Sequence, residues 1–435
     1  MSINLTKVAK ERDIKYFLIS FVDLFGVLRS KLVPARAIGD MQTDGAGFAG
    51  FAAWLDMTPA DSDMFSVPDP ESLIQLPWKP EVAWLAGDLV MDGKAVEASP
   101  RVALKRQLER AAKKGYRMKT GVECEYFLVS ADGMSISDAN DTQGKPCYDQ
   151  SALMRRYDVI SEICDCMIEL GWGPYQNDHE DANGQFEMNW DYDDALLTAD
   201  RHVFFKYMVK AIAEKHGLRA TFMPKPFTTL TGNGCHAHVS VWDSTGNKNL
   251  FHHGRDEMGL SKLAYQFLGG ILHNAEALTA VFNPTVNSYK RIDAQVTLSG
   301  ATWSPNAVTY GGNNRTHMVR IPDKGRFELR LMDGAANPYL LQAGVLAAGL
   351  DGVENKRDPG KRQDVNMYTE GHKVRGARRL PTNLLDAVRV FQKSKVLRAG
   401  FGDELVDSYA KLKIQDWRSY SSAISQWERD NTLDC

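Results

Sequence analysis

Residues 119–129 read KTGVECEYFLV, an apolar run that carries two acidic side chains. Its length and its content of β-branched and aromatic residues favour a β-strand. Because the side chains of a strand alternate between its two faces, Glu123 and Glu125 share one face and Cys124 lies on the other. The sequence therefore predicts a strand with one acidic face and one apolar face.

Three further segments alternate in the same way: GQFEMNW at 184–190, CHAHVSVW at 235–242 and GRFELRLM at 325–332. Any one of them is more often an amphipathic strand with a solvated face, and a lone His-x-His is more often structural than a ligand pair. Together they supply carboxylates, imidazoles and guanidiniums but very few lysines. Their polar positions are Gln185, Glu187, Asn189, His236, His238, Ser240, Arg326, Glu328 and Arg330.

The chemistry of these groups favours phosphoryl transfer. If the strands are adjacent, their carboxylates repel one another unless cations lie among them. Oxygen-rich ligand sets suit Mg²⁺ or Mn²⁺, and an added imidazole is compatible with Mn²⁺. The planar guanidinium of arginine matches the oxygens of a phosphate. Carboxylates, divalent cations and arginines together are typical of sites that transfer a phosphoryl group.

The length of 435 residues predicts two domains. A helix start is visible at Ser99-Pro100, where a hydroxyl at the N-cap precedes a proline at the first helical position. We therefore expect a small β-rich domain over residues 1–99 and a larger mixed domain over residues 100–435. The fold class that this organisation predicts is α+β.

Composition argues against several partners and compartments. The formal net charge is −3, with no run of basic residues, which argues against nucleic acid or a membrane surface as the main partner. The apolar stretches are too short or too charged to predict a membrane span, and the N-terminus does not resemble a signal peptide. The six cysteines form no C-x-x-C pair and fit a reducing cytoplasm, so we expect a cytoplasmic protein.

Six motifs occur in an order that resembles the glutamine synthetase superfamily. They are E-x-E at 123–125, HEDANGQFE from His179, GNGCHAH from Gly232, NSYKR ending at Arg291, NNRTHMVRIP from Asn313 and RFELRLMDGAANPYL from Arg326. One such motif is weak evidence, whereas six in order are strong evidence. The resemblance implies an N-terminal β-grasp domain and a catalytic domain with a curved antiparallel sheet and helices. It also implies a homo-oligomer, a dodecamer of two stacked hexameric rings with active sites shared between subunits.

The resemblance also implies a role for each matching residue. One metal position matches Glu125, Glu180 and Glu187, and a second matches Glu123, His236 and Glu328. ATP matches Tyr192, His238, Ser240, Arg320 and Arg326, and glutamate matches Gly232, Arg291 and Arg330. The catalytic arginines are Arg315, which stabilises the transferring phosphoryl group, and Arg330. The implied reaction is ATP-dependent: the γ-carboxylate of glutamate becomes γ-glutamyl phosphate, and an amine then displaces phosphate, with two or more Mg²⁺ or Mn²⁺ ions per site.

The sequence departs from ammonia-using members at the positions that bind ammonium. Ala49, in GFAGFAA, replaces an aspartate, and Trp303, in a flap that is several residues longer, replaces a glutamate. Thr231 replaces an asparagine that contacts glutamate. Fewer carboxylates weaken the capture of bare ammonium, whereas an indole face attracts an alkylammonium ion. We therefore expect an amine pocket between Ala49 and Trp303 that takes methylamine or another small alkylamine, as in the γ-glutamylmethylamide synthetase subgroup.

Several alternatives stay open at this point. Trp303 can simply pack the flap while Asp56 or Asp293 captures ammonium, as in an ordinary glutamine synthetase. Larger amines such as ethanolamine or a polyamine form a second alternative. A non-catalytic relative and a metal-dependent hydrolase are the alternatives from other classes. The segment 380–391, LPTNLLDAVRVF, does not resemble the tyrosine loop that is adenylylated in many bacterial glutamine synthetases, so we expect no control by adenylylation.

Overall fold

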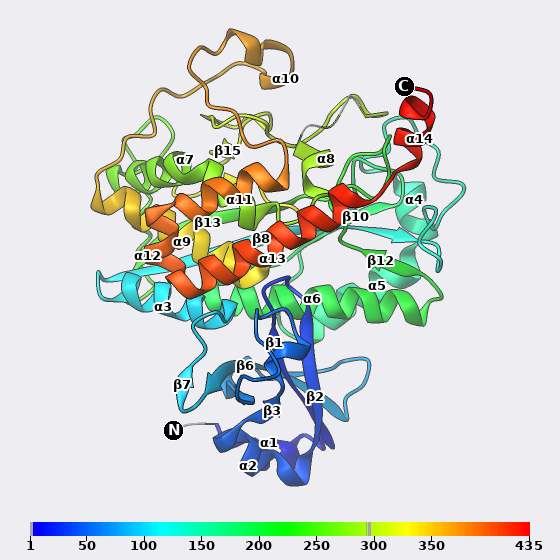
Figure 1. Ribbon diagram of the computed structural model, residues 1–435, viewed down its shortest axis with the longest axis vertical. Coiled ribbons are helices and arrows are strands. Elements are labelled where there is room, and N and C mark those ends of the chain that lie inside the picture. Colours follow the sequence, from blue (N-terminus) through cyan, green and yellow to red (C-terminus); the bar gives the residue numbers. More distant parts are fainter. Residues whose placement is uncertain (1–2, 293, 295–296) are drawn as a thin grey trace.

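A computed structural model describes residues 3–292, 294 and 297–435 of the protein. Two β-sheets organise these residues, each with its own covering helices (Figure 1). Figure 1 shows the N-terminal sheet at one end of the molecule and the larger sheet, enclosed by helices, at the other. This arrangement confirms the predicted α+β class.

The N-terminal sheet has the order β2-β1-β6-β4-β3, with β5 and β7 attached to β6. Its strands are β1 (Tyr16–Val22), β2 (Leu28–Pro34), β3 (Ala46–Phe48), β4 (Met64–Pro68), β5 (Ile74–Gln75), β6 (Val82–Met91) and β7 (Lys94–Ala95). β1 and β2 form a hairpin, and β1 runs parallel to β6. Helices α1 (Leu5–Glu11) and α2 (Ile38–Asp44) contribute buried residues to the core that β1 and β6 share. All seven strands therefore lie before residue 99, and the domain boundary at that residue stays a prediction.

The larger sheet has the order β14-β15-β16-β13-β8-β10-β9, with β11 and β12 also paired with β8. Its strands are β8 (Tyr116–Val129), β9 (Gln176–His179), β10 (Gln185–Asn189), β11 (Asp193–Asp194), β12 (Arg219–Thr221), β13 (Cys235–Asp243), β14 (Tyr310–Gly311), β15 (Val319–Arg320) and β16 (Phe327–Leu329). All of its pairs are antiparallel except β14 with β15, so the sheet is mixed. β8 and β13 lie at the centre of the sheet.

Long helices cover this sheet: α3 (Pro100–Ala112), α5 (Tyr157–Glu169), α6 (Ala195–Lys215), α7 (Lys262–Phe282) and α9 (Pro338–Glu354). α7 and α9 approach very closely, since a Cβ at Gly270 would lie 2.0 Å from the carbonyl oxygen of Ala348. Glycine is therefore needed at this crossing. The remaining helices are α4 (Gln150–Arg155), α8 (Ser288–Ile292), α10 (Met367–Glu370), α11 (Leu384–Lys393), α12 (Lys395–Phe401), α13 (Asp403–Ser422) and α14 (Gln426–Thr432). None of the described helices is long and apolar enough to cross a membrane.

A buried arginine connects the two sheets. Arg101 of α3 pairs with Asp69 at 2.8 Å, with Asp88 of β6 at 2.7 Å and with Asp200 of α6 at 2.9 Å. Its side chain is 3% exposed, and Asp200 also accepts a hydrogen bond from Tyr339 at 2.6 Å. Because three aspartates from different elements share this guanidinium, the network should fix the N-terminal sheet against α3 and α6.

We expect Arg101→Met to destabilise the protein by about 3–5 kcal/mol, because removal of the guanidinium leaves the buried charge of Asp200 uncompensated. Urea unfolding followed by circular dichroism would measure this loss. Arg110→Met is the matched control on the same helix, since Arg110 pairs with Glu354 where both side chains are about 30% exposed. The free energy of unfolding should fall by less than about 1 kcal/mol in Arg110→Met. Equal losses in the two variants would contradict the role of the network.

Candidate active site

A row of charged side chains crosses the larger sheet on one face. On one side of β8, Glu125 lies directly opposite Glu187, and Glu187 lies opposite Asp178. On the other side, Glu123 lies opposite His236, and His238 lies opposite Glu328. Because directly opposed residues of paired strands project to the same face, the row is continuous from β9 to β16. The predicted alternation is confirmed, and the register brings the four predicted segments together.

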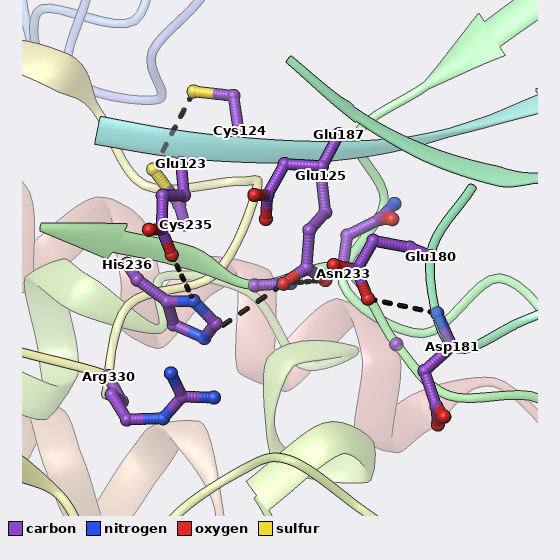
Figure 2. Close-up of polar contacts among 12 residues, drawn as sticks. Glu123, Cys124, Glu125, Glu180, Asp181, Glu187, Asn233, Cys235, His236 and Arg330 are labelled. Carbon is purple, nitrogen blue, oxygen red and sulfur yellow. Dashed lines mark hydrogen bonds and ion pairs between the residues drawn. The ribbon is translucent and has the colours of Figure 1, made fainter. Parts of the chain in front are cut away.

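Glu123 lies at the middle of this row, between two histidines. Its carboxylate oxygens lie 3.1 Å from Nδ1 of His236 and 2.8 Å from Nε2 of His238. Glu328 is completely buried, 3.7 Å from His236 and 2.7 Å from Arg320, and it also accepts a hydrogen bond from Arg330. Figure 2 shows His236 between Glu123 and Glu125, with Arg330 on the far side of the imidazole. The three predicted ligands of the second metal therefore meet at one place.

The other carboxylates converge beside Glu125. Backbone N–H of Gly234 and the side chain of Gln185 donate to Glu125, at 2.7 and 3.1 Å. Burial, followed by repulsion from Glu125 and other neighbouring carboxylates, raises the pKa of Glu180. Burial, followed by repulsion from Glu123 and other carboxylates, also raises the pKa of Glu187. Such mutual repulsion is what bound cations would relieve.

Asp178 is a functional candidate that the sequence analysis missed. Asp178 lies on β9, directly opposite Glu187 of β10. Burial, followed by repulsion from Glu123 and Glu125, raises the pKa of Asp178 to about 6. Its Oδ1 is buried with no hydrogen-bond partner among the described residues. The available signal was the two-residue spacing from Glu180, which is the same spacing that links Glu123 with Glu125.

The donor set fits divalent cations. Ligand atoms of Glu123, Glu187 and His236 lie within 4.8 Å of one another, as do those of two further trios, Glu123–His238–Glu328 and Asp178–Glu180–Glu187. Nε2 of His236 is buried without a hydrogen-bond partner among the described residues and lies 3.9 Å from Glu125. Carboxylate oxygens with one or two imidazoles suit Mg²⁺ or Mn²⁺. These trios divide the residues differently from the two predicted sets, since Glu123 belongs to two of them.

The residues predicted to bind ATP continue along β13 away from this centre. Arg326 contacts Nδ1 of His238. Arg320 donates hydrogen bonds to the side chains of Glu328 and Asn313. Ser240 accepts a hydrogen bond from Trp242 at 2.9 Å. The ring of Tyr192, 54% exposed, stacks on Trp242 with centroids 6.4 Å apart. The exposed ring of Tyr192 suits a base at the end of a triphosphate.

The residues predicted to bind glutamate lie beside the centre. Arg291 is 2% exposed and forms no ion pair among the described residues, and its guanidinium donates a long hydrogen bond, 3.4 Å, to the carbonyl oxygen of Leu331. A buried guanidinium without a carboxylate partner suits a carboxylate ligand. A Cβ at Gly232 would lie 2.2 Å from the carbonyl oxygen of Pro224, and one at Gly234 would lie 2.9 Å from Arg291, Glu125 and His236. Both glycines of GNG are therefore needed for this close packing.

Trp303 and Arg315 line one cavity of about 630 Å³. Its other lining residues are Gly312, Asn313, Asn314, Thr316, Asp364, Asn366 and Tyr368. Trp303 has a φ of 53°, a backbone conformation that non-glycine residues seldom adopt. The predicted flap residue therefore lies next to the predicted catalytic arginine.

The flap is tied to the sheet through Asp181. This carboxylate accepts hydrogen bonds from Thr231, at 2.6 Å, and from Ser299. Thr231 and the flap residue Ser299 therefore share one carboxylate acceptor.

The two predicted substitutes for an ammonium-binding carboxylate have different outcomes. Asp56 pairs with Lys411 at 2.7 Å, so its charge is already compensated. Asp293 lies outside the described residues. Ala49 is exposed, and it is not among the described residues that line the cavity of Trp303. Within one chain the predicted amine pocket is therefore incomplete.

Comparisons with known proteins agree with this geometry. Residues 97–432 match the family model described as glutamine synthetase, catalytic domain. A glutamine synthetase of Rhizobium leguminosarum bv. phaseoli is 64% identical over 434 residues, with all of both chains covered. A glutamate–methylamine ligase of Methyloversatilis universalis is 44% identical, with 98% of this chain and 97% of that protein covered.

A solved structure described as a GmaS/ADP complex is also similar. It has a TM-score of 0.96 and 65% identity, and all of both chains are covered. An apo GmaS structure without ligand gives a TM-score of 0.95 at 64% identity, with 99% of each chain covered. The match of the family model over most of the chain and the full-length relatives lead to one conclusion: this chain belongs to the glutamine synthetase family.

Proposed function

We propose that the protein is an ATP-dependent ligase that joins the γ-carboxylate of glutamate to methylamine and yields γ-glutamylmethylamide, ADP and phosphate. The similarity to GmaS, a γ-glutamylmethylamide synthetase, and to a glutamate–methylamine ligase supports this substrate. The observation that carries the reaction is the continuous row of carboxylates and histidines, bounded by arginines, on one face of the sheet.

The proposed reaction follows from the reactivity of a carboxylate. A carboxylate is a poor acyl donor because oxide is a poor leaving group, whereas phosphate leaves easily from γ-glutamyl phosphate. Two Mg²⁺ or Mn²⁺ ions held by the row would offset the charge of the triphosphate and of the glutamate carboxylate. We assign these ions to Glu123, Glu125, Glu180, Glu187, His236 and Glu328.

The protein's own residues orient the substrates. Arg291 and Arg330, with the backbone at Gly232, would hold glutamate beside Glu125. Arg320 and Arg326, with His238 and Ser240, would hold the phosphates, while Tyr192 would flank the adenine. Arg315 would stabilise the charge on the phosphoryl group as it moves between oxygens. Asp178 adds a carboxylate at the end of the row, where a cationic amine gains from negative charge.

We also propose that the site is completed by a second subunit in a cytoplasmic dodecamer of two stacked hexameric rings. Ala49 is exposed and does not line the cavity of Trp303 within one chain, which supports this arrangement because a neighbouring copy can bring the two together. Sedimentation velocity of the purified protein would measure the assembly, and a stable monomer would contradict it.

Steady-state kinetics with methylammonium and ammonium tests the proposed substrate. We expect a higher kcat/KM for methylammonium, with glutamate and ATP both required. The second candidate is an ordinary glutamine synthetase, and the 64% identical relative from Rhizobium leguminosarum favours it. An equal or higher kcat/KM for ammonium would select that candidate.

Trp303→Glu should shift the preference toward ammonium. A carboxylate in the cavity attracts a small cation, and loss of the indole removes the face that contacts the methyl group. Discrimination by one methyl group is about ten- to two-hundredfold, so the ratio of the two kcat/KM values should change within that range. Trp303→Phe is the matched control and should retain the preference for methylammonium. If the glutamate variant changed both amines equally, Trp303 would not line the amine pocket.

A further inference from the structure

Two cysteines lie directly beneath the charged row. Cys124 of β8 and Cys235 of β13 oppose each other across the two central strands. Cys124 lies between Glu123 and Glu125, and Cys235 precedes His236, so both thiols project to the opposite face from the row. Each is 1% exposed, and Figure 2 shows their sulfur atoms linked by a dashed line.

The geometry of this pair suits a disulfide. The sulfur atoms are 3.9 Å apart. Backbone N–H of Glu125 donates to the carbonyl oxygen of Gly234 at 3.3 Å, which makes Cys124 and Cys235 a non-hydrogen-bonded pair. In such pairs the Cα atoms lie about 4.5 Å apart. Disulfides span Cα separations of about 4.4–6.8 Å, so the backbone already has a suitable spacing.

The surroundings of the pair hold a third polar group that the ligase reaction does not use. Nε2 of His202, on α6, lies 3.9 Å from the sulfur of Cys235. Nδ1 of His202 has no hydrogen-bond partner among the described residues, although the residue is 1% exposed. Cys124, Cys235 and His202 therefore form a small polar cluster within an apolar core. Thiols in such a cluster can still be oxidised to a disulfide.

We propose that Cys124 and Cys235 form a reversible disulfide in the presence of hydrogen peroxide, and that this cross-link inactivates the site on the other face of the same strands. One thiol sulfur attacks peroxide, so an S–O bond forms, the O–O bond breaks, and water leaves. The second sulfur attacks the resulting sulfenic acid, so the S–S bond forms, the S–O bond breaks, and a second water leaves. Two thiols are oxidised by one peroxide, and both thiol protons leave in the two waters.

Inactivation follows from the position of the cysteines within the strands. The sulfur atoms must close from 3.9 Å to about 2.05 Å, which changes the local geometry of β8 and β13. The neighbours along the chain are Glu123, Glu125 and His236, which face the active site. A misplacement of about 1 Å at a catalytic site can cost about a hundredfold in rate.

The test treats the full-length protein with hydrogen peroxide, a small neutral oxidant suited to a buried pair. Free thiols are blocked with N-ethylmaleimide, and unreduced proteolytic peptides are analysed by mass spectrometry. We expect a Cys124–Cys235 linked peptide, a ten- to hundredfold loss of kcat/KM and recovery in dithiothreitol. Cys124→Ala and Cys235→Ala should retain activity after peroxide, and either variant suffices if the other does not fold. Cys166→Ala, which removes a buried cysteine of α5, is the matched control and should lose activity like the unmodified protein.

The expected loss of activity rests on the proposed ligase function, whereas detection of the linked peptide does not depend on that function. Disulfide formation without ligase activity would therefore count against the proposed function and not against the thiol pair. Absence of the linked peptide would overturn the proposal. If peroxide inactivated both alanine variants as strongly as the unmodified protein, the disulfide would not be the cause of inactivation. One tightly bound zinc ion per chain that protects the thiols from peroxide would also contradict a regulatory disulfide.

Discussion

Glu123→Gln should lower kcat by about a thousandfold, the largest effect we expect in the metal centre. Glu123 lies between His236 and His238 and contributes to two of the ligand trios. The amide keeps the size of the side chain but removes the negative charge, so the cations lose stabilisation of several kcal/mol. Each 1.36 kcal/mol of transition-state stabilisation corresponds to about a tenfold change in rate.

Formation of ADP at saturating glutamate, amine and ATP would measure this loss across a Mg²⁺ and Mn²⁺ titration. Partial recovery at high metal concentration is expected, because weaker binding is part of the defect. Glu109→Gln, on an exposed position of α3, is the control and should leave kcat unchanged. A Glu123→Gln enzyme with normal kcat and normal metal dependence would remove the basis of the proposed centre.

Arg315→Ala should lower kcat by about a thousandfold or more with little effect on thermal stability. An arginine that stabilises a transferring phosphoryl group contributes about 10³–10⁵ in kcat. Arg315 lines the cavity with Trp303 and Tyr368, and it forms no ion pair among the described residues. Its guanidinium is therefore available to a ligand, and its loss should not disturb the packing of the fold.

Separate determination of kcat and KM distinguishes the proposed role of Arg315 from simple substrate binding. A role at the transition state lowers kcat and leaves the KM for glutamate and ATP nearly unchanged. Arg315→Lys keeps the charge but not the planar guanidinium, so it should recover only part of the rate. A variant with raised KM and normal kcat would assign Arg315 to substrate binding instead.

The strand predictions succeeded because alternation is a local property. In the segment 119–129, the positions of Glu123 and Glu125 two residues apart determine which face they share, whatever the strand pairs with. The same reasoning placed His236 with His238, and the structure confirms both faces. The helix start at Pro100 was also local, since it depends on the residues at the N-terminus of α3.

Local patterns in the chain predicted the strands, the faces of their charged residues and, through six motifs, the family. Which charged residues meet became clear only from the folded chain, which added Asp178, grouped Glu123 with two sets of ligands, left Ala49 out of the cavity of Trp303 and placed Cys124 opposite Cys235. The reason is that periodicity acts within a few residues of the chain. Strand register instead joins segments that can lie far apart in the chain, such as Glu125 with Glu187, His238 with Glu328 and Cys124 with Cys235, and it depends on the packing of the whole sheet.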